Sequence, residues 1–576
     1  MKELIIKYAY LQVIIISLFT SLTVQAKDLV FQAMQDELNR SMQSLIIEDM
    51  SPPYFLSYQV RDIEIVEINA SYGALVKSEH TENRYLYTDL RVGSPARDNS
   101  NYISAWQEVF NMRDGLVEEN DYSSLRHQLW LLTDKAYKKA AENLARKEAY
   151  LQTHPSGEIM DDFSTAESVV QLGEAPQFKL NQTKWEDQVR QAAQKLRDFT
   201  KLEDWKVNFS YSVVNKRYLN SEGSQFQDGF TNHRLEVSAT IQAKDGQRLT
   251  GFFESITCDD EEPLPGEALL NRVQQLGEEL EEMAKANSLD EYVGPVLFCD
   301  FATAQFISQL FVRQLTPVQL PLLAEDWMNQ YLQPGKLGGR LNRRIFPDFV
   351  TIIDEPTRKT WQNQNLLGFR SLDDEAVPCQ RITLVSDGRL QTLPNTRQPT
   401  KKIPQSNGHA VALQNQWNIP AATNLFVETG NPLSEKKLID KLQKLAKDFG
   451  NEYGLLITLL EEERYSQLYR WTEKEPDQQV LLTAPVIMYK VYAGDGHLEP
   501  VRGLEFDEVS IRTMRDVAAM GKEARVYNIA QSTVLPGDFY YPASIVTPAV
   551  LVEEMELKAV AEREPLPVSP RPLVKK

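Results

Sequence analysis

The sequence predicts an α+β fold, and three observations support this prediction. Segments with apolar residues at helical spacing occur together with runs rich in β-branched and aromatic residues. The chain opens with one such helical segment followed by successive strand-like runs, which is an α+β pattern. The dipeptides Asp245-Gly246 and Asp387-Gly388 each separate two strand-like runs, as in antiparallel hairpins. We therefore expect an N-terminal helix-plus-antiparallel-sheet domain with a helical insertion and a larger β-rich C-terminal domain.

The N-terminal elements begin with an amphipathic helix over Lys27–Glu48, which Pro52-Pro53 ends. Three strand-like runs follow, each broken by Asn or Gly: Tyr54–Ile68, Ala70–Glu79 and Asn83–Val92.

The next segment is predicted to be largely helical. Apolar residues at helical spacing predict that Trp106–Ala149 is a charged helical stretch, and the loss of periodicity over Thr153–Phe178 predicts a linker or surface loop. Further elements complete this half: a helix at Trp185–Asp198, a strand at Lys206–Val214, a turn at Tyr218–Ser224, a hairpin of Leu235–Ala243 and Leu249–Thr257, and a helix at Glu267–Asn287.

A domain boundary is expected near Leu289–Tyr292, and strand and turn signals dominate beyond it. The predicted elements are strands at Gly294–Cys299, Phe349–Ile353 and Val480–Tyr492, a hairpin of Arg381–Val385 and Arg389–Leu393, a helix at Ser434–Phe449 and an apolar segment at Val546–Met555. Residues 559–576 are rich in Pro and charge, so we predict a disordered tail.

Composition limits the domains and the kinds of partner. The chain has 576 residues, 42% of them hydrophobic and 25% charged, which is ample material for a core. At roughly 150 residues per domain, this length corresponds to about three or four domains. The net charge of −19 repels phosphate backbones and anionic lipid, so we expect no nucleic-acid partner.

Residues 1–26 have the features of a secretory signal peptide. A short basic stretch precedes the apolar run Leu11–Phe19, and a Val-Gln-Ala cleavage site ends at Ala26. We predict cleavage between Ala26 and Lys27. An uncleaved anchor is the alternative, but the apolar run is shorter than the ~20 residues that span a bilayer. The mature chain is expected to be exported (periplasmic or extracellular), soluble and without a membrane partner.

Cys258, Cys299 and Cys379 are the only cysteines. Because their number is odd and no C-x-x-C spacing occurs, neither a disulfide framework nor a zinc knuckle is predicted. We expect small buried side chains, with one disulfide among the three left open.

The histidines do not form a helical metal motif, because the closest two are separated by 27 positions (154 − 127). Nor does the sequence contain a G-x-S-x-G elbow, a Walker motif or a dinucleotide-binding glycine pattern. We therefore assign no catalytic, metal-binding or cofactor-binding residue from the sequence. The six histidines are His80, His127, His154, His233, His409 and His497.

Four local features suggest chemistry, but a structural role is the better interpretation of each. Three adjacent acids, Asp373-Asp374-Glu375, would point in different directions, so loop contacts are favoured over acid–base work. Ser406 and His409 could act as nucleophile and base, but a glycine-dependent turn is favoured. The acidic run Asp259–Glu262 is expected to be a solvated loop and Gly335–Gly339 a plain turn.

Read in order, the C-terminal half resembles the TldD/PmbA family, which comprises metallopeptidase-related proteins also called modulators of DNA gyrase. Two upstream stretches, SYGALVKSEHTENRYLYTDLRVG (71–93) and YLNSEGS (218–224), resemble the family's N-terminal part, whereas about 105–205 looks like an insertion. The C-terminal stretches are YVGPVLFCDFATAQFISQLF (292–311), GKLGGRLNRRIFPDFVTIIDEPT (335–357), GFRSLDDEAVPCQRITLVSDGRLQTLPNTRQP (368–399), SNGHA (406–410), FVETGNPLSEKKLI (426–439) and TPAVLVEEMEL (547–557).

The resemblance implies a metal site that the sequence does not supply. Active members resemble a peptidase that binds metal through a His-Glu-x-x-x-His helix and a downstream cysteine. The corresponding helix here would be Phe301–Leu315, which contains neither histidine nor acid, and the region 521–546 contains no cysteine. No metal ligand is carried over, no cofactor is expected, and the pattern resembles the PmbA-like branch.

These observations give three functional hypotheses. The leading one is a non-catalytic subunit of a metallopeptidase assembly for peptide processing, a homo- or hetero-oligomer with a metal-binding TldD-like chain. A stand-alone peptide-binding protein and a hydrolase using non-metal residues are the alternatives. The expected organisation is 1–26 signal peptide, 27–290 N-terminal region, 291–558 C-terminal domain and 559–576 tail.

Overall fold

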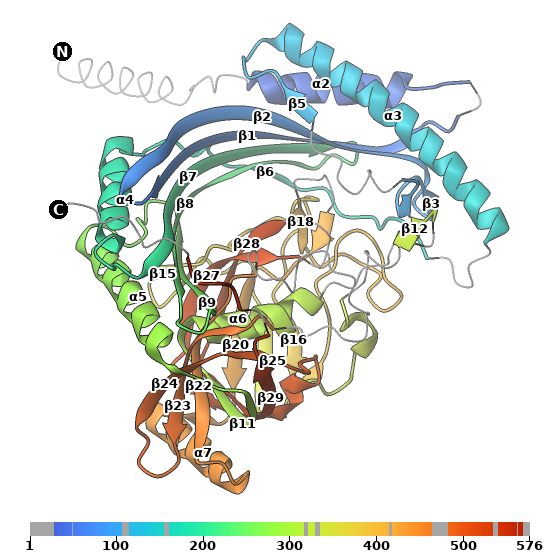
Figure 1. The fold of residues 1–576 in the computed structure, drawn as a ribbon. Coiled ribbons are helices and arrows are strands. Elements are labelled where there is room, and N and C mark those ends of the chain that lie inside the picture. The colour runs from blue at the N-terminus through green and yellow to red at the C-terminus, as the bar shows by residue number, and fades with distance from the viewer. Residues whose placement is uncertain are drawn as a thin grey trace, which may run out of the picture.

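The computed structural model describes residues 28–48, 50–105, 114–154, 160–315, 321–325, 327–328, 335–413, 418–463, 482–533, 539–561 and 563–567. The predicted signal peptide and its cleavage site lie outside these residues. The predicted α+β fold is confirmed, with helices arranged around several largely antiparallel sheets (Figure 1). No helix within the described residues is long and apolar enough to span a bilayer.

The N-terminal half is built on one strongly curved antiparallel sheet. Its long strands lie in the order β2-β1-β7-β8-β9, and the short strands β3, β5 and β6 add at its margins. The long strands are β1 (Pro53–Ser71), β2 (Ala74–Ser94), β7 (Leu202–Asn220), β8 (Gln225–Gln242) and β9 (Arg248–Cys258).

Two long strands replace the three predicted at the start of this sheet. β1 and β2 pair along their whole length, and the chain reverses at Tyr72-Gly73, where φ is 52° and 87°. The predicted breaks at Asn69 and between Glu79 and Asn83 are therefore wrong. The polar residues there continue the strand because one of its faces is uncovered at that point, so polarity does not interrupt the pairing.

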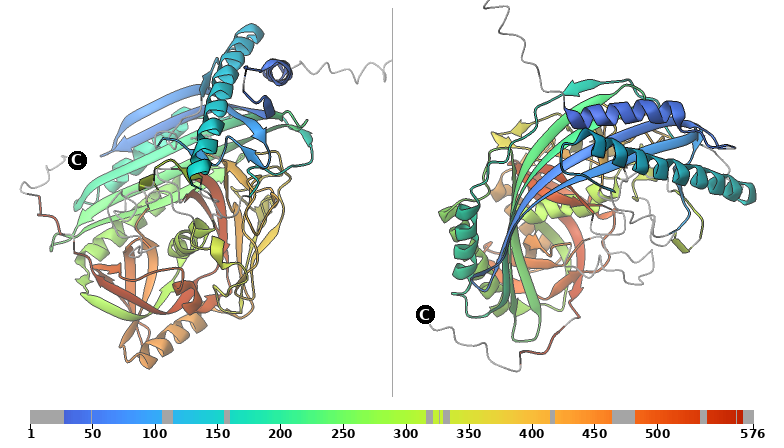
Figure 2. Two further views of the ribbon diagram at one scale, coloured as in Figure 1. Left: turned by 90° about the vertical axis from the view of Figure 1, so that its right-hand side faces the viewer. Right: turned by 90° about the horizontal axis from the view of Figure 1, so that it is seen from above.

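Helices cover the convex face of the sheet at its two ends (Figures 1 and 2). α2 (Leu29–Ser44) and α3 (Tyr122–Thr153) pack on one end, and α4 (Gln182–Leu196) and α5 (Glu267–Lys285) on the other. The Asp28 side chain accepts N–H groups from the first turn of α2, which fixes where that helix begins. The concave face is turned toward the C-terminal domain.

The C-terminal domain contains two sheets around a large apolar core. One has the order β10-β24-β23-β22-β11-β29-β26-β21 and the other β17-β16-β13-β20-β28-β27. The predicted segment Val546–Met555 spans the turn between two of these strands. The main strands are β11 (Glu291–Phe298), β13 (Val350–Asp354), β16 (Ile382–Ser386), β20 (Asn424–Thr429), β22 (Tyr453–Leu460), β23 (Pro485–Tyr492), β24 (Leu498–Arg502), β26 (Val517–Gly521), β27 (Arg525–Ser532), β28 (Tyr540–Thr547) and β29 (Val550–Ala559).

The helix α6 (Asp300–Leu310) lies between these two sheets, and α7 (Glu435–Asp448) covers the outer face of the first. The remaining elements are short strands and 3-10 turns: β3 (Arg97–Asp98), β4 (Tyr102–Ile103), β5 (Asp114–Leu116), β6 (Val170–Leu172), β10 (Asn287–Ser288), β12 (Leu322–Leu323), β14 (Thr360–Trp361), β15 (Gln364–Asn365), β17 (Arg389–Leu390), β18 (Ala410–Ala412), β19 (Asn418–Pro420), β21 (Pro432–Leu433), β25 (Leu504–Phe506), η2 (Val312–Gln314), η4 (Gly338–Arg340) and η7 (Thr513–Asp516).

The start of the predicted disordered tail makes specific contacts. The Glu564 N–H donates to the Gly246 carbonyl at 3.0 Å, and the Gln242 amide donates to the Glu564 carbonyl at 2.9 Å. The close approach needs a glycine, because a Cβ at Gly246 would lie 2.4 Å from the Glu564 oxygen. The tail is thus held against the β8–β9 turn as far as Glu564.

Candidate functional site

The helix α6 occupies the centre of the C-terminal domain, directly after β11. Its residues from Ala302 to Leu310 are all buried, with Phe306 and Ile307 in the main apolar core. It contacts β11 and β22 of one sheet and β27 and β28 of the other. The structure therefore places α6 beside β27 and β28, in the region where the family resemblance puts the downstream cysteine.

The buried polar side chains of α6 are hydrogen-bonded to backbone, amide and hydroxyl groups. Gln305 donates to the Leu460 carbonyl at 3.0 Å and accepts the Leu460 N–H at 2.9 Å. Ser308 donates to Gln531 Oε1 at 2.9 Å, which links α6 to β27. These bonds satisfy groups in an otherwise apolar interior, and they orient α6 between its two sheets.

A pocket, here called the α6 pocket, opens beside this helix between the N-terminal and C-terminal sheets. Within the described residues β9 pairs only with β8 and β27 only with β28, and residues of both strands line this pocket. The Asn528 amide bridges them by donating to the Ile256 carbonyl at 3.1 Å. Its lining is aromatic and polar: Arg234, Phe252, Glu254, Phe301, Ala304, Gln305, Ser308, Gln309, Glu462, Glu463, Ile529, Ala530 and Tyr540.

Charged side chains in the α6 pocket are paired across elements. The Arg234 guanidinium donates to Glu254 at 2.8 Å, joining β8 to β9. Arg313 lies 3.4 Å from Glu463, which also accepts a hydrogen bond from the Ser532 hydroxyl. The pocket walls are thus held by ion pairs, with aromatic surface between them.

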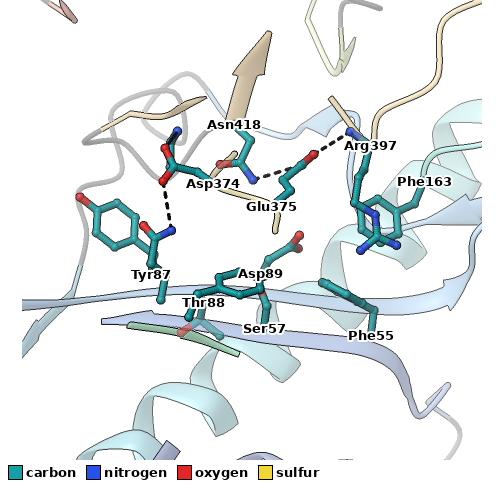
Figure 3. Close-up of a pocket in the computed structure, with 13 residues that line it drawn as sticks. Phe55, Ser57, Tyr87, Thr88, Asp89, Phe163, Asp374, Glu375, Arg397 and Asn418 are labelled. Carbon is teal, nitrogen blue, oxygen red and sulfur yellow. Dashed lines mark hydrogen bonds between the residues drawn. The ribbon is translucent and has the colours of Figure 1, made fainter. Parts of the chain in front are cut away.

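A second cavity, here called the seam pocket, lies where the concave face of the N-terminal sheet meets C-terminal loops (Figure 3). Asp89 points from β2 toward Glu375, and Asn418 donates to Glu375 from above at 3.2 Å. It is lined by Phe55, Ser57, Gln59, Tyr87, Thr88, Asp89, Phe163, Tyr218, Asp374, Glu375, Arg397, Ala412 and Asn418.

Asp374 is the main ionic contact of the seam pocket. Its carboxylate lies 3.2 Å from Lys216 and 3.4 Å from Arg61, both on the concave face, and 3.8 Å from Arg370. Burial opposes its ionised form, but these three cations outweigh burial and hold the pKa of Asp374 well below its usual range. Asp374 is therefore ionised at neutral pH and ties the two halves together.

The adjacent acids Asp373 and Glu375 have different partners from Asp374. Asp373 accepts the N–H groups of Glu375 and Val377 in its own loop and that of Ala410 at the start of β18. Glu375 accepts the Arg397 N–H at 2.6 Å. Burial raises the pKa of both Asp373 and Glu375. The prediction that the three acids do not converge on one atom is confirmed, and their contacts are structural.

Comparisons with known proteins add an independent line of observation. Residues 328–559 match the family model described as the PmbA/TldA metallopeptidase C-terminal domain. A metalloprotease of Archaeoglobus fulgidus is 32% identical over 93 residues, which are 16% of this chain and 20% of that protein. The chain thus matches about a fifth of that relative's length.

Solved structures show the same architecture. TldE of Thermococcus kodakarensis aligns with a TM-score of 0.59 at 12% identity, over 92% of this chain and 100% of that one. A putative modulator of a DNA gyrase from Thermotoga maritima aligns with a TM-score of 0.57 at 14% identity, with the same coverage of both chains. At these identities the likeness concerns the fold.

The chain belongs to the TldD/PmbA family.

In this TldD/PmbA chain, Ser406 and His409 do not form a nucleophile–base pair. Ser406 Oγ accepts the Gly408 N–H at 3.2 Å and donates to the Asn395 carbonyl at 3.3 Å. His409 is buried, with Nδ1 bonded to the Asn407 carbonyl and Nε2 3.2 Å from Asp354. Gly408 has a φ of +75°, so the predicted glycine-dependent turn is confirmed.

The other two candidates, Gly335–Gly339 and Asp259–Glu262, are also ordinary structural features. Gly335–Gly339 forms turns that lead into a 3-10 helix. Asp259, Asp260 and Glu262 form exposed ion pairs with lysines, as expected of a solvated loop.

The three cysteines of this TldD/PmbA chain are free thiols, so the open question of one disulfide is resolved against it. Burial raises the pKa of Cys258 and Cys299 to about 12, and it raises that of the buried Cys379 as well. The prediction of small buried side chains is confirmed for Cys379, whereas Cys258 and Cys299 are half-buried.

A cluster on the convex face is absent from the site residues predicted from the sequence. Glu64, His80 and Glu82 place one ligand atom each within 4.8 Å of one another. They were missed because histidines were compared by their spacing along the chain, whereas His80 and Glu64 meet across the β1–β2 hairpin. An alternating pattern continued through residues 79–83 would have placed them on one sheet face.

Proposed function

We propose that this chain is an exported, catalytically silent subunit of a TldD/PmbA-type peptidase assembly. It would pair with a second chain that carries an intact His-Glu-x-x-x-His helix and supplies the metal chemistry. One observation supports this proposal above all. The helix α6 lies where the family resemblance puts the metal-binding helix, but its buried polar side chains are hydrogen-bonded to other protein groups.

The residues of α6 do not fit a metal. Zinc in proteins takes imidazole nitrogen, thiolate sulfur or carboxylate oxygen as ligands. The polar side chains of α6 beside the pocket are instead Gln305, Ser308 and Gln309. Each of them is hydrogen-bonded to a protein partner, so ligating an ion would break those bonds. No metal-dependent step is therefore assigned to this chain.

What such a subunit retains is a surface for an extended peptide. The edges of β9 and β27 offer backbone groups beside the α6 pocket, and a peptide strand can pair with such an edge regardless of its sequence. Phe252, Phe301 and Tyr540 provide apolar contact for its side chains. Peptide binding here would present a substrate to the partner's metal site.

Peptide cleavage is the deciding measurement. The mature chain, purified alone, is expected to cleave no fluorogenic peptide in buffer with added zinc. Mixed with a TldD-like chain from the same genome, it should form a stable complex that cleaves the peptide and loses activity with chelator. Cleavage by the chain alone that a chelator abolishes would overturn the proposal.

Export is supported by the sequence of residues 1–26 and has its own test. Expression of the full chain in a bacterial host, followed by cell fractionation and N-terminal sequencing, should give a protein that begins at Lys27 outside the cytoplasm. A cytoplasmic protein that retains Met1 or Lys2 would refute export without affecting the subunit assignment.

A stand-alone peptide-binding protein is the second candidate, because the same strand edges could hold a peptide without any catalytic partner. Fluorescence anisotropy with an unfolded labelled peptide distinguishes the two. Tight binding by the chain alone, together with failure to associate with any TldD-like chain, would favour this second function.

A further inference from the structure

The middle of the convex face of the N-terminal sheet is left uncovered by the helices. The apolar residues of β1 are buried under α2 and α3 up to Val60, and under α4 from Val66 onward. Between them lies a polar stretch, with Glu64 directly opposite Glu82 and Val66 opposite His80 in the β1–β2 register. Figure 2, seen from above, shows the two strands between the helix pairs.

The geometry of this polar stretch suits a small cation. His80 Nε2 lies 2.8 Å from Glu64 Oε1, and one oxygen of each glutamate and the imidazole nitrogen are all within 4.8 Å of one another. Zinc–ligand bonds of about 2.1 Å in a tetrahedron separate the ligand atoms by about 3.4 Å. Small rotations of exposed side chains are sufficient to reach that spacing.

Among the residues that the structure describes, no lysine or arginine forms an ion pair with either glutamate, and of the two His80 bonds to Glu64 alone. Like charges directly opposite on neighbouring strands destabilise a sheet. Within the described residues Glu82 makes no hydrogen bond or ion pair, and the nearest cation along β2 on this face, Arg84, is bonded to Asp62. The other nearby cation, Lys77, is paired with Glu67 and Glu79 on the opposite face.

The imidazole is held in place by neighbouring rings. The His80 ring stacks on Phe178 with centroids 5.0 Å apart and an interplanar angle of 18°. Phe178 in turn packs edge-on against Tyr211 at 5.3 Å, and the Tyr211 hydroxyl accepts the Lys179 N–H at 3.2 Å. With this stacking, Nε2 is directed at Glu64. Residues around a metal site orient its histidine ligands in a comparable way.

We propose that Glu64, His80 and Glu82 form a binding site for a divalent transition-metal cation of the zinc type. One nitrogen and two carboxylate oxygens, with a remaining position for water, is a ligand set that zinc accepts. The ion joins β1 to β2 and neutralises the opposed glutamates. This site is separate from α6 and independent of any catalytic role.

The test is metal binding by the untagged mature chain. Isothermal titration with zinc chloride should give one site, and cobalt(II) should give the visible absorption of a site with low coordination number. His80→Ala and Glu82→Gln should each weaken zinc binding at least tenfold while leaving far-UV circular dichroism unchanged, since both residues are on an exposed surface. Zinc should also raise the Tm of the wild-type chain and not that of either variant.

A matched control is available at another surface histidine. His497 lies 2.8 Å from Asp495, and among the described residues no third ligand atom joins this pair within 4.8 Å, so His497→Ala should leave zinc binding unchanged. Equal zinc affinity in wild type and His80→Ala, or no zinc binding by the wild-type chain, would overturn the proposal. Because the readout is binding and not cleavage, the result does not depend on the subunit function.

Discussion

Arg397 of the C-terminal domain holds Glu222 of the N-terminal sheet through both terminal guanidinium nitrogens, at 2.6 and 2.8 Å. Its Nε donates to the Ser164 carbonyl at 2.9 Å, and its guanidinium carbon lies 3.9 Å from the centre of the Phe163 ring. The same ring receives Arg91 from β2 at 3.8 Å. Phe163 and Ser164 belong to the segment Thr153–Phe178, which lacks periodicity in the sequence. These two residues therefore lie at the centre of the joint between the two domains.

Replacing Arg397 with alanine should lower the free energy of unfolding by about 2–3 kcal/mol. Breaking a fully buried ion pair costs about 3–5 kcal/mol, and Glu222, which is 32% exposed, recovers part of this from solvent. Arg397→Lys should recover little, because lysine has no fork to match both carboxylate oxygens. Urea unfolding followed by tryptophan fluorescence measures both.

Arg381 serves as the control for this experiment. It lies on an exposed surface 3.9 Å from Glu355, so Arg381→Ala should change the unfolding free energy by less than about 1 kcal/mol. Equal effects of the Arg397 and Arg381 substitutions would show that the joint contributes no special stability.

Asp374 should make the protein sensitive to acid. Its folded pKa is lowered by Lys216, Arg61 and Arg370, whereas an unfolded aspartate titrates near 3.9. The stability from its ionised form is thus fully present above about pH 4 and is lost as the pH falls through the folded value. Asp374→Asn should be less stable at pH 7 by about 3–5 kcal/mol and should lose part of the acid dependence.

Unfolding midpoints measured from pH 2.5 to 7 test this prediction. Asp507→Asn removes an exposed ion pair with Lys558, and it should leave the decrease of the unfolding midpoint at low pH unchanged. If Asp374→Asn showed the same decrease at low pH as the wild type, the ionic contact across the seam would not be the cause.

The elements that the sequence predicts well are those fixed by local chemistry. Ser434 caps α7, whose leucine spacing gives its length, and Asp387-Gly388 turns a hairpin as expected. The seam could not be predicted, because Asp374 meets Lys216 across 158 positions and no local pattern encodes that contact. The same holds for Glu64 and His80, whose proximity depends on the register of two strands.

The turn at Gly408 should tolerate no side chain. A Cβ at this glycine would lie 2.2 Å from the Pro378 carbonyl oxygen, and its φ of +75° is strained for any L residue. Gly408→Ala should cost about 3 kcal/mol, as the backbone and overpacking penalties add. At Gly450 φ is +78° and nothing lies within 4 Å of the added Cβ, so Gly450→Ala should cost only about 1 kcal/mol. Thermal unfolding of the two variants separates steric from backbone strain, and equal costs would argue against the clash.

Gln309 tests whether α6 has become a purely structural helix. Its Oε1 accepts the Thr483 N–H at 2.9 Å and its Nε2 donates to the Thr483 hydroxyl at 3.1 Å, so Gln309→Ala leaves a buried backbone N–H unsatisfied. The expected loss is about 2–3 kcal/mol, whereas Gln275→Ala, which removes an exposed bond to Glu279, should cost less than about 0.5 kcal/mol. Association with a TldD-like chain should survive Gln309→Ala at temperatures where the variant stays folded, and the cleavage rate of that complex should be unchanged. A complex that forms normally but loses cleavage would instead place Gln309 in the chemistry and contradict the silent-subunit proposal.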